Sequence, residues 1–406
     1  MSFISCITHG LGWFSPLPRM VRLCVFKFGI LPFSTCYERF ILDRWQNHFS
    51  GHGYCGYTGN FDVVRARHSV EALLELGGKR YQFTPRDGEA KLQVIQLTAA
   101  SLKEKIESLG GSWKKNNTEI IISQPTQITS EWNAFYEVLK KIFPNQGEGG
   151  LITSVHADQI PFFEEAKRTE CILFSRLGKS FVMNKFEIGY FLGKGLDVCV
   201  YDTRGVLNSE GYPTEAGLYN DIESVYDFLI KSYDPSKICI YGSCGESFSA
   251  MHLFAKYHSK GINLILDNAP GSLAQVMARV NWIAAWLFDF AADYIKAPVT
   301  SKCHETREDG FNSLKKINEL SENKQAGYVI LSKTVGDELV PPTEVDRMAT
   351  LLKSKGNIVS VLENDAKDSL ARKNLGDPHL ANPLRNPHLQ SDFIKALFAP
   401  KSLQNL

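Results

Sequence analysis

One cysteine stands where a strand-like run turns into a helix-like stretch. The apolar run Ile238–Tyr241 leads into Gly242-Ser243-Cys244-Gly245-Glu246-Ser247, and the helix-like Phe248–Tyr257 follows. A strand, a sharp turn of small residues and a helix form the setting of a nucleophile elbow, in which the turn lifts one side chain above the sheet. With Gly242 as the first glycine of G-x-nucleophile-x-G, the predicted nucleophile is Cys244. A helix N-terminus and a neighbouring imidazole favour a thiolate there.

Two serines compete for the same role. Gly245-Glu246-Ser247 resembles the G-E-S of some esterases, which would make Ser247 the nucleophile, and Ser243 ranks third. Cys244 ranks above Ser247 because the second register inserts three residues between strand and elbow. Glu246 stands where the motif has its second glycine. The competing interpretation is a tight turn that carries an inert cysteine.

An acid follows a later apolar run. Tyr328–Ser332 leads into a loop that contains Asp337 and Glu338. An acid beyond such a strand is where the third member of a triad would orient a histidine. We predict Asp337 for this role, with Glu338 as the fallback. The alternative is a surface aspartate ahead of a helix that begins at Pro341-Pro342.

A histidine completes the set. Beyond the last apolar run, Ile358–Leu362, a loop reaches His379, whereas His388 abuts the predicted final helix and is less able to reach back. A histidine in this place can move the proton of the nucleophile. Along the chain, Cys244, Asp337 and His379 therefore follow one another in the order nucleophile, acid and base.

For these three residues to meet, the strands that precede them must end at the same edge of one sheet. From about residue 170, short apolar runs alternate with helix-length segments, of which 215–232 has the clearest apolar stripe. The runs are Cys171–Ser175, Val198–Asp202, Ile238–Tyr241, Leu264–Asp267, Tyr328–Ser332 and Ile358–Leu362. Apolar strands separated by helices predict an α/β fold with a mainly parallel sheet covered by helices on both faces. Sites in such sheets form at the carboxyl ends of the strands.

Three regions are expected along the chain. Residues 1–75 form an N-terminal arm or subdomain, residues 76–165 an opening hairpin plus an insertion, and residues 166–406 the core, with a small insertion at about 275–325 over the strand ends. The hairpin spans 81–97 around Asp87-Gly88. The following insertion is expected to hold a helix from Leu102, a strand at Ile120–Ser123 and a helix around Trp132–Phe143.

The amino-acid composition excludes several classes of protein. The 406 residues are 44% hydrophobic and 22% charged, which excludes a disordered or coiled-coil protein. The 45 basic and 44 acidic residues argue against a nucleic-acid-coating protein. The nine cysteines form no CxxC pair, and those in the apolar runs (Cys171, Cys199 and Cys239) fit small buried side chains, so a reducing, cytoplasmic compartment is expected.

Cofactor motifs and membrane spans are not predicted. Gly51–Gly56 matches G-x-G-x-x-G, but it follows no apolar strand and opens no helix, and no metal-ligand or nucleotide-loop pattern is present, so no cofactor is implied. Residues 1–35 are apolar, but Arg19, Arg22 and Lys27 interrupt them, and no stretch is long enough to span a membrane. They are a candidate for packing on the protein's own core, or for contact with a membrane surface or a protein partner.

The later part of the chain resembles the α/β-hydrolases. Tyr201–Gly211, continued by Pro213-Thr214-Glu215, is similar to their Y-D-x-R-G-x-G-x-S-x-G-x-P-T-E stretch. The resemblance is strongest to the serine-hydrolase group that contains the Bem46-like proteins and the protein depalmitoylases, since Ile238–Leu253 aligns with its elbow without a gap. Phe311–Ile317 and Asp337–Pro341 are similar to its later motifs. The resemblance covers roughly residues 165–400.

This resemblance implies a hydrolase of an ester, thioester or amide that acts on an acyl or peptide-like substrate. The oxyanion hole would use the N–H of Gly245 and one from the loop at Arg176 and Leu177. Family members carry a serine in place of Cys244 and a His-Gly pair where this chain has Ser175-Arg176-Leu177-Gly178. The alternative is therefore an inactive hydrolase-like scaffold that binds a lipid or protein partner. The chain also resembles a branch of hydrolase-like proteins from intracellular bacteria, some of which are secreted effectors, and this implies secretion into a host cytosol as an alternative location.

Overall fold

The structure is a computed structural model. It describes residues 70–116, 119–142, 169–175, 185–204, 209–210, 215–273, 275–276, 311–321 and 327–365, together with Leu384, Leu389, Phe393 and Leu397. The predictions for residues 1–69, for the segment 277–310 and for most of the final helix lie outside these residues.

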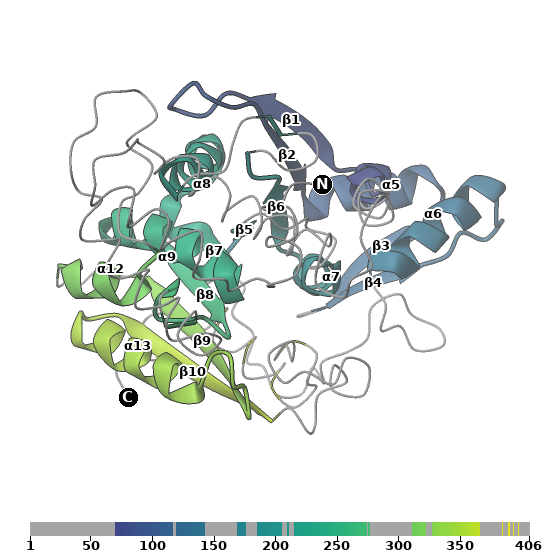
Figure 1. Cartoon of the computed structure of the whole chain (residues 1–406). Helices are drawn as coiled ribbons and strands as arrows, with labels where there is room; N and C mark the ends of the chain where they lie inside the picture. Colours follow the sequence, from purple (N-terminus) through teal and green to yellow (C-terminus); the bar gives the residue numbers. More distant parts are fainter. Residues whose placement is uncertain are drawn as a thin grey trace, which may run out of the picture.

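An eight-stranded sheet forms the centre of the fold (Figure 1). Its strands are β1 (Lys79–Phe83), β2 (Leu92–Leu97), β5 (Cys171–Phe174), β6 (Asp197–Tyr201), β7 (Ile238–Ser243), β8 (Asn263–Asp267), β9 (Tyr328–Val335) and β10 (Ile358–Asp365). They lie in the order β1-β2-β6-β5-β7-β8-β9-β10. Only the β1–β2 and β2–β6 pairs are antiparallel, and all the pairs from β6 to β10 are parallel. The predicted mainly parallel sheet is confirmed.

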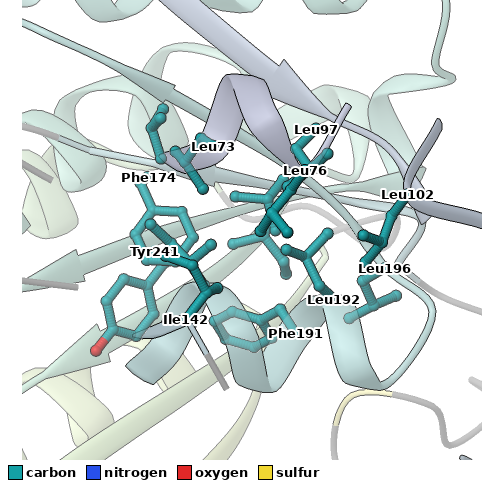
Figure 2. Packing of buried hydrophobic residues seen from close by; sticks show 14 of the residues in the cluster. Leu73, Leu76, Leu97, Leu102, Ile142, Phe174, Phe191, Leu192, Leu196 and Tyr241 are labelled. Atoms are coloured by element: carbon teal, nitrogen blue, oxygen red, sulfur yellow. The ribbon is translucent and has the colours of Figure 1, made fainter. Parts of the chain in front are cut away.

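Helices connect the parallel strands and cover both faces of the sheet. They are α7 (Lys185–Gly193), α8 (Glu215–Leu229), α9 (Ser247–Lys256), α12 (Ser313–Glu319) and α13 (Pro342–Ser354). Alternate strand residues point to opposite faces. Phe174, Tyr241 and Ile330 therefore join the cluster that contains α7, while Leu173, Ile240 and Leu331 join the cluster that contains α8, α9, α12 and α13. Figure 2 shows the first cluster, in which Leu192 and Leu196 lie near Leu97 and Leu102.

The β1–β2 hairpin is part of this sheet, as strand β2 pairs with β6. Its turn has Gly88 at φ +72°, with the Gly88 N–H donating to the carbonyl of Pro85 at 3.0 Å. Glycine takes this left-handed conformation without steric cost. The prediction of a hairpin around Asp87-Gly88 is confirmed.

A helix–hairpin–helix segment follows β2. It consists of α5 (Ala99–Ser108), β3 (Ser112–Asn116), β4 (Glu119–Ser123) and α6 (Ser130–Ile142). Both predicted helices and the predicted strand are present, but β4 pairs with a strand, β3, that the sequence pattern did not predict. Its residues Ser-Trp-Lys-Lys-Asn show no apolar alternation, and the backbone pairing with β4 defines the strand.

The three core cysteines lie in adjacent strands. Cys171, Cys199 and Cys239 have no exposed surface, and all three are free thiols. Burial raises the pKa of each thiol, because a thiolate would lose its hydration there. They are small buried side chains, as predicted, and neutral at physiological pH.

Candidate active site

The candidate site lies where the chain leaves the sheet in two opposite directions. After β5 the chain continues through α7 to β6 on one side, and after β7 it continues through α9 to β8 on the other. Such a switch of direction opens a crevice at the carboxyl ends of the two strands, where α/β proteins bind ligands. Cys244 directly follows β7 at this place.

The backbone of Cys244 is strained. Among the described residues, only three other than glycine have a positive φ, and they are Cys244 at +51°, Asn268 and Phe311. A left-handed conformation costs a residue with a Cβ about 1–2 kcal/mol. Ser243 before Cys244 is extended, and the short helix η7 (Cys244–Glu246) leads directly into α9. The strained residue is thus at the apex of the strand-to-helix turn, where an elbow holds its nucleophile. The Cys244 side chain keeps 9% of its surface exposed.

Ser247 lies below this apex. It is the first residue of α9, it is fully buried, and its hydroxyl donates to the carbonyl of Cys244 at 2.5 Å. The hydroxyl therefore ties the first turn of α9 to the elbow. Cys244 is therefore the more accessible of the two groups.

Gly242 provides the close packing that an elbow needs. A Cβ at this position would lie 2.9 Å from the Cβ of Ala250, 2.9 Å from the Cα of Ser247 and 3.1 Å from the carbonyl oxygen of Glu246. Any side chain at Gly242 would push α9 away from β7. Glu246, at the place of the motif's second glycine, is accommodated as a buried residue.

The loop after β5 is attached to the elbow by Ser175. The Ser175 N–H donates to the carbonyl of Tyr241, and its hydroxyl donates to the carbonyl of Glu246, both at 2.8 Å. Ser175 directly precedes Arg176 and Leu177, the predicted oxyanion residues, which lie outside the described residues. Sequence reasoning did not single out Ser175, because its partner is 71 positions away in the chain.

Asp337 is a buried residue of the loop after β9, and it is not the surface aspartate of the alternative interpretation. Only 3% of it is exposed, whereas Glu338 is exposed. Its Oδ1 accepts the N–H groups of Leu339 and Val340, both at 2.9 Å, and its own N–H donates to the carbonyl of Thr334 at 3.2 Å. Of the two acids in this loop, Asp337 is thus the buried one, and its role as the acid of a triad stays a prediction. Helix α13 begins at Pro342, as the proline pair indicated.

Cys244 and Asp337 follow strands β7 and β9, and β8 lies between them. Neighbouring strands are about 4.8 Å apart, so β7 and β9 end at the same edge of the sheet with about 10 Å between the two strands. The proton relay needs an imidazole within hydrogen-bond distance of both groups. His379 and His388 lie outside the described residues, and the predicted base stays a prediction. Leu384, in the same segment as His379, is buried in the α7-side cluster.

Arg204, from the stretch similar to the α/β-hydrolases, has a structural role. Its guanidinium, with the residue 2% exposed, binds Asp221 of α8 through Nε at 2.9 Å and an amino nitrogen at 2.7 Å, and that nitrogen is 2.7 Å from Asp87 of the hairpin. Burial raises the pKa of Asp221 to about 6, although Arg204 opposes that shift. This ion pair joins the loop after β6 to α8 and to the hairpin.

A second buried carboxylate joins α8 to α9. Oε1 of Glu223 lies 2.7 Å from Nε2 of His252 and 2.6 Å from Nζ of Lys256, and Oε2 lies 2.7 Å from Arg86. Burial alone would raise the pKa of Glu223, but the hydrogen bonds from His252 and Lys256 lower it to about 2. Tyr219 stacks on the His252 ring at 3.9 Å. These contacts hold the helix that carries the elbow.

Among the described residues, no group of three or more His, Cys, Asp or Glu side chains could hold a metal ion. No helix in the same part of the chain is long and apolar enough to cross a membrane.

No protein-family model matches the sequence. The multifunctional-autoprocessing repeats-in-toxin proteins of Vibrio cholerae and Vibrio vulnificus are 30% identical over 93 residues, which is 22% of this chain and 2% of each toxin. An uncharacterized membrane protein of Saccharomyces cerevisiae is 26% identical over 175 residues, 41% of this chain and 55% of that protein. The chain thus spans a small part of the two toxins and about half the length of the yeast protein.

Three solved structures align with much of the chain at low identity. An alpha-beta hydrolase from Vibrio vulnificus has a TM-score of 0.47 at 13% identity, covering 87% of this chain and 90% of that one. The esterase Pf2001 of Pyrococcus furiosus has a TM-score of 0.39 at 17% identity, covering 71% and 81%. The acylaminoacyl peptidase of Pyrococcus horikoshii has a TM-score of 0.42 at 12% identity, covering 80% and 42%.

Proposed function

We propose that this protein is a hydrolase of the α/β-hydrolase superfamily that cleaves an ester, thioester or amide through Cys244. The observation that carries the proposal is the positive φ of Cys244 at the carboxyl end of β7. Strain of this kind persists only where the surrounding structure imposes it, and it concentrates at functional sites. Here Gly242, Ser247 and Ser175 impose it through close packing and hydrogen bonds.

The proposed reaction has two steps. The Cys244 sulfur attacks the substrate carbonyl, and His379 takes the thiol proton and passes it to the leaving alcohol, thiol or amine. A water molecule, which gives its proton to His379, then hydrolyses the acyl-thioester and regenerates Cys244. Asp337 orients His379 and stabilises its imidazolium form. The N–H of Gly245 and an N–H from the Arg176–Leu177 loop hold the negative oxygen of each tetrahedral intermediate.

Two features support a thiol in this chemistry. Cys244 lies at the N-terminal end of the η7–α9 segment, where the helix dipole favours a thiolate. The other three described cysteines are fully buried with raised pKa values. Among the described thiols, a reagent that attacks thiolates should therefore react at Cys244.

The test combines a thiol reagent with a nitrophenyl ester. Wild-type protein is incubated with iodoacetamide and the modified residue is identified by peptide mass spectrometry; p-nitrophenyl butyrate then measures the release of nitrophenolate. We expect alkylation at Cys244, and both Cys244→Ala and prior alkylation should abolish turnover. Ser247→Ala is the comparison variant. It removes the hydrogen bond from Ser247 to the Cys244 carbonyl and should cost much less turnover than Cys244→Ala. Turnover that survives Cys244→Ala but not Ser247→Ala would contradict the cysteine assignment.

A second candidate function is a catalytically inactive scaffold for a lipid or protein partner. It is favoured by Glu246 in place of the second glycine and by Ser175-Arg176-Leu177-Gly178 in place of the family's His-Gly pair. It predicts that Cys244 reacts with iodoacetamide no faster than a free thiol of ordinary pKa, and that no nitrophenyl ester is turned over.

We also propose that the protein acts in a reducing cytosol, including that of a host cell as a secreted effector, and that residues 1–35 contact a membrane surface or a partner protein. Scattered free cysteines are typical of a reducing compartment, and the similarity to two toxins over 93 residues supports the effector proposal. Removal of residues 1–35 should abolish sedimentation with anionic phospholipid vesicles; unchanged sedimentation would contradict the membrane contact.

A further inference from the structure

A row of polar residues lies along the carboxyl edge of the sheet, from β7, which precedes Cys244, to β9, which precedes Asp337. Ser243 of β7 is the register partner of Asp267 of β8, which in turn is the partner of Ser332 of β9. The Ser332 hydroxyl donates to Asp267, and both residues are buried. This row sits directly above the apolar core formed by Tyr241, Ile265 and Ile330 on the same face.

One residue further along, the end of β8 is bound to β9 by a second side-chain hydrogen bond. The Thr334 hydroxyl donates to Oδ1 of Asn268 at 3.0 Å, and the Asn268 N–H donates to the carbonyl of Ser332 at 3.2 Å. Thr334 is fully buried and Asn268 is almost so. Asn268 is therefore held to β9 through its backbone and its side chain.

The backbone of Asn268 indicates that its side chain matters. Its φ is +44°, in the left-handed region. Glycine takes that conformation without steric cost, so an asparagine there is explained by the hydrogen bond that its side chain makes. Cys244 and Asn268, which follow neighbouring strands, are two of only three such non-glycine residues in the described part of the chain.

Thr334 is also hydrogen-bonded to the backbone of Asp337. Its carbonyl accepts the N–H of Asp337 at 3.2 Å, which closes the turn through Gly336 at φ +83°. Asp337 then accepts the N–H groups of Leu339 and Val340. A continuous series of hydrogen bonds thus runs from the end of β8, next to the elbow, to the backbone N–H of Asp337.

We infer that Asn268 and Thr334 are positioning residues for the acid of the proposed reaction. Their hydrogen bond holds the turn of Asp337 against the end of β8, and so sets the distance from Asp337 to the elbow. The inference rests on the proposed function of Cys244 and Asp337. It assigns no contact with substrate to either residue, because both act through Asp337.

The test follows the pH dependence of Cys244 alkylation by iodoacetamide between pH 5 and 9. Under the proposed function, an ion pair between Cys244 and His379 keeps the thiolate reactive below the ordinary thiol pKa of about 8.5. Asp337→Asn should then move the profile to higher pH. Thr334→Val keeps the shape of the side chain and removes the hydroxyl. It should lower the alkylation rate at pH 6.5 about tenfold and move the profile in the same direction.

Two variants serve as controls. Thr334→Ser keeps the hydroxyl and should restore the wild-type profile. Thr350→Val removes an exposed threonine hydroxyl of α13 that donates to the carbonyl of Asp346, and it should change nothing. Asn268→Gly removes the acceptor at a position whose backbone suits glycine, so it gives the same test if Thr334→Val does not fold.

The outcomes separate the two claims. A wild-type profile in Thr334→Val and Asn268→Gly, beside a shifted profile in Asp337→Asn, overturns the positioning role alone. A lower melting temperature with an unchanged profile does the same, since it shows a purely structural hydrogen bond. An ordinary thiol profile in wild-type protein that Asp337→Asn does not alter overturns the proposed function, and this inference with it.

Discussion

Replacing Gly242 by alanine adds a single methyl group beneath the elbow. The new Cβ would lie 2.9 Å from both the Cβ of Ala250 and the Cα of Ser247, whereas ordinary contacts of this kind begin at 3.4 Å. These atoms belong to α9 or its backbone, so neither can swing aside. The start of α9 must therefore move from β7 by about 0.5 Å or more, and overpacking of this kind costs about 1–3 kcal/mol of folding free energy.

The shift should reach Cys244, because it lies between Gly242 and Ser247 in the same turn. A misplacement of 1 Å costs about 100-fold in rate, so half of that predicts a loss of about tenfold. We would measure the rate of Cys244 alkylation by iodoacetamide at pH 6.5, the turnover of p-nitrophenyl butyrate and the thermal melting temperature of the same samples.

Gly88→Ala is the matched control. Gly88 is at φ +72° with no atom within 4 Å of the added Cβ, so the change costs about 1–2 kcal/mol through backbone strain alone. Its alkylation rate should equal that of wild-type protein. Alkylation and melting temperature that both stay unchanged in Gly242→Ala would refute the packing argument. Equal losses of alkylation in both variants would show that stability, and not elbow geometry, controls the reactivity.

Three further predictions follow from the ion pairs and the acid loop. Gly217→Ala places a Cβ 2.6 Å from the Arg204 guanidinium, so it should destabilise the protein by about 1–3 kcal/mol, although alanine usually stabilises a helix. Denaturant unfolding measures this loss. In an Arg204→Leu background the loss should be largely absent, because the clashing guanidinium is gone. The pKa of Glu223, lowered from 4.5 to about 2, contributes stability above about pH 5 that is lost as the pH falls toward 2. This pKa shift corresponds to a free energy of unfolding of about 3 kcal/mol, which solvent screening of the half-exposed Arg86 and Lys256 reduces toward about 1 kcal/mol. Glu223→Gln should therefore flatten the acid-denaturation curve between about pH 5 and pH 2. Glu338→Gln should leave the pH profile of Cys244 alkylation unchanged, since the Glu338 side chain is exposed, and a shift as large as that of Asp337→Asn would make Glu338 the acid.

The sequence alone was sufficient for the fold class and for the apex of the elbow. Apolar runs and helical stripes are local patterns, with periods that the backbone geometry of strands and helices imposes. The small residues of 242–245 and the adjacent strand and helix are equally local, so the position of Cys244 could be counted from the end of Ile238–Tyr241. Strand β3 was missed because its lysines and asparagine carry no period-two pattern, and only its pairing with β4 makes it a strand.

Tertiary structure decided which polar residues surround the site. The order of the strands places β8 between β7 and β9, and no local pattern encodes that order. It brings Ser175 to Glu246, Asn268 to Thr334, and the Asp337 turn to the end of β8, across separations of 71 residues in the first case and 66 in the second. The burial of Asp337 likewise depends on these neighbours, which is why sequence left it open between a triad acid and a surface residue. Hydrogen bonds between side chains on different strands depend on tertiary contact, because each partner alone is an ordinary serine, threonine or asparagine.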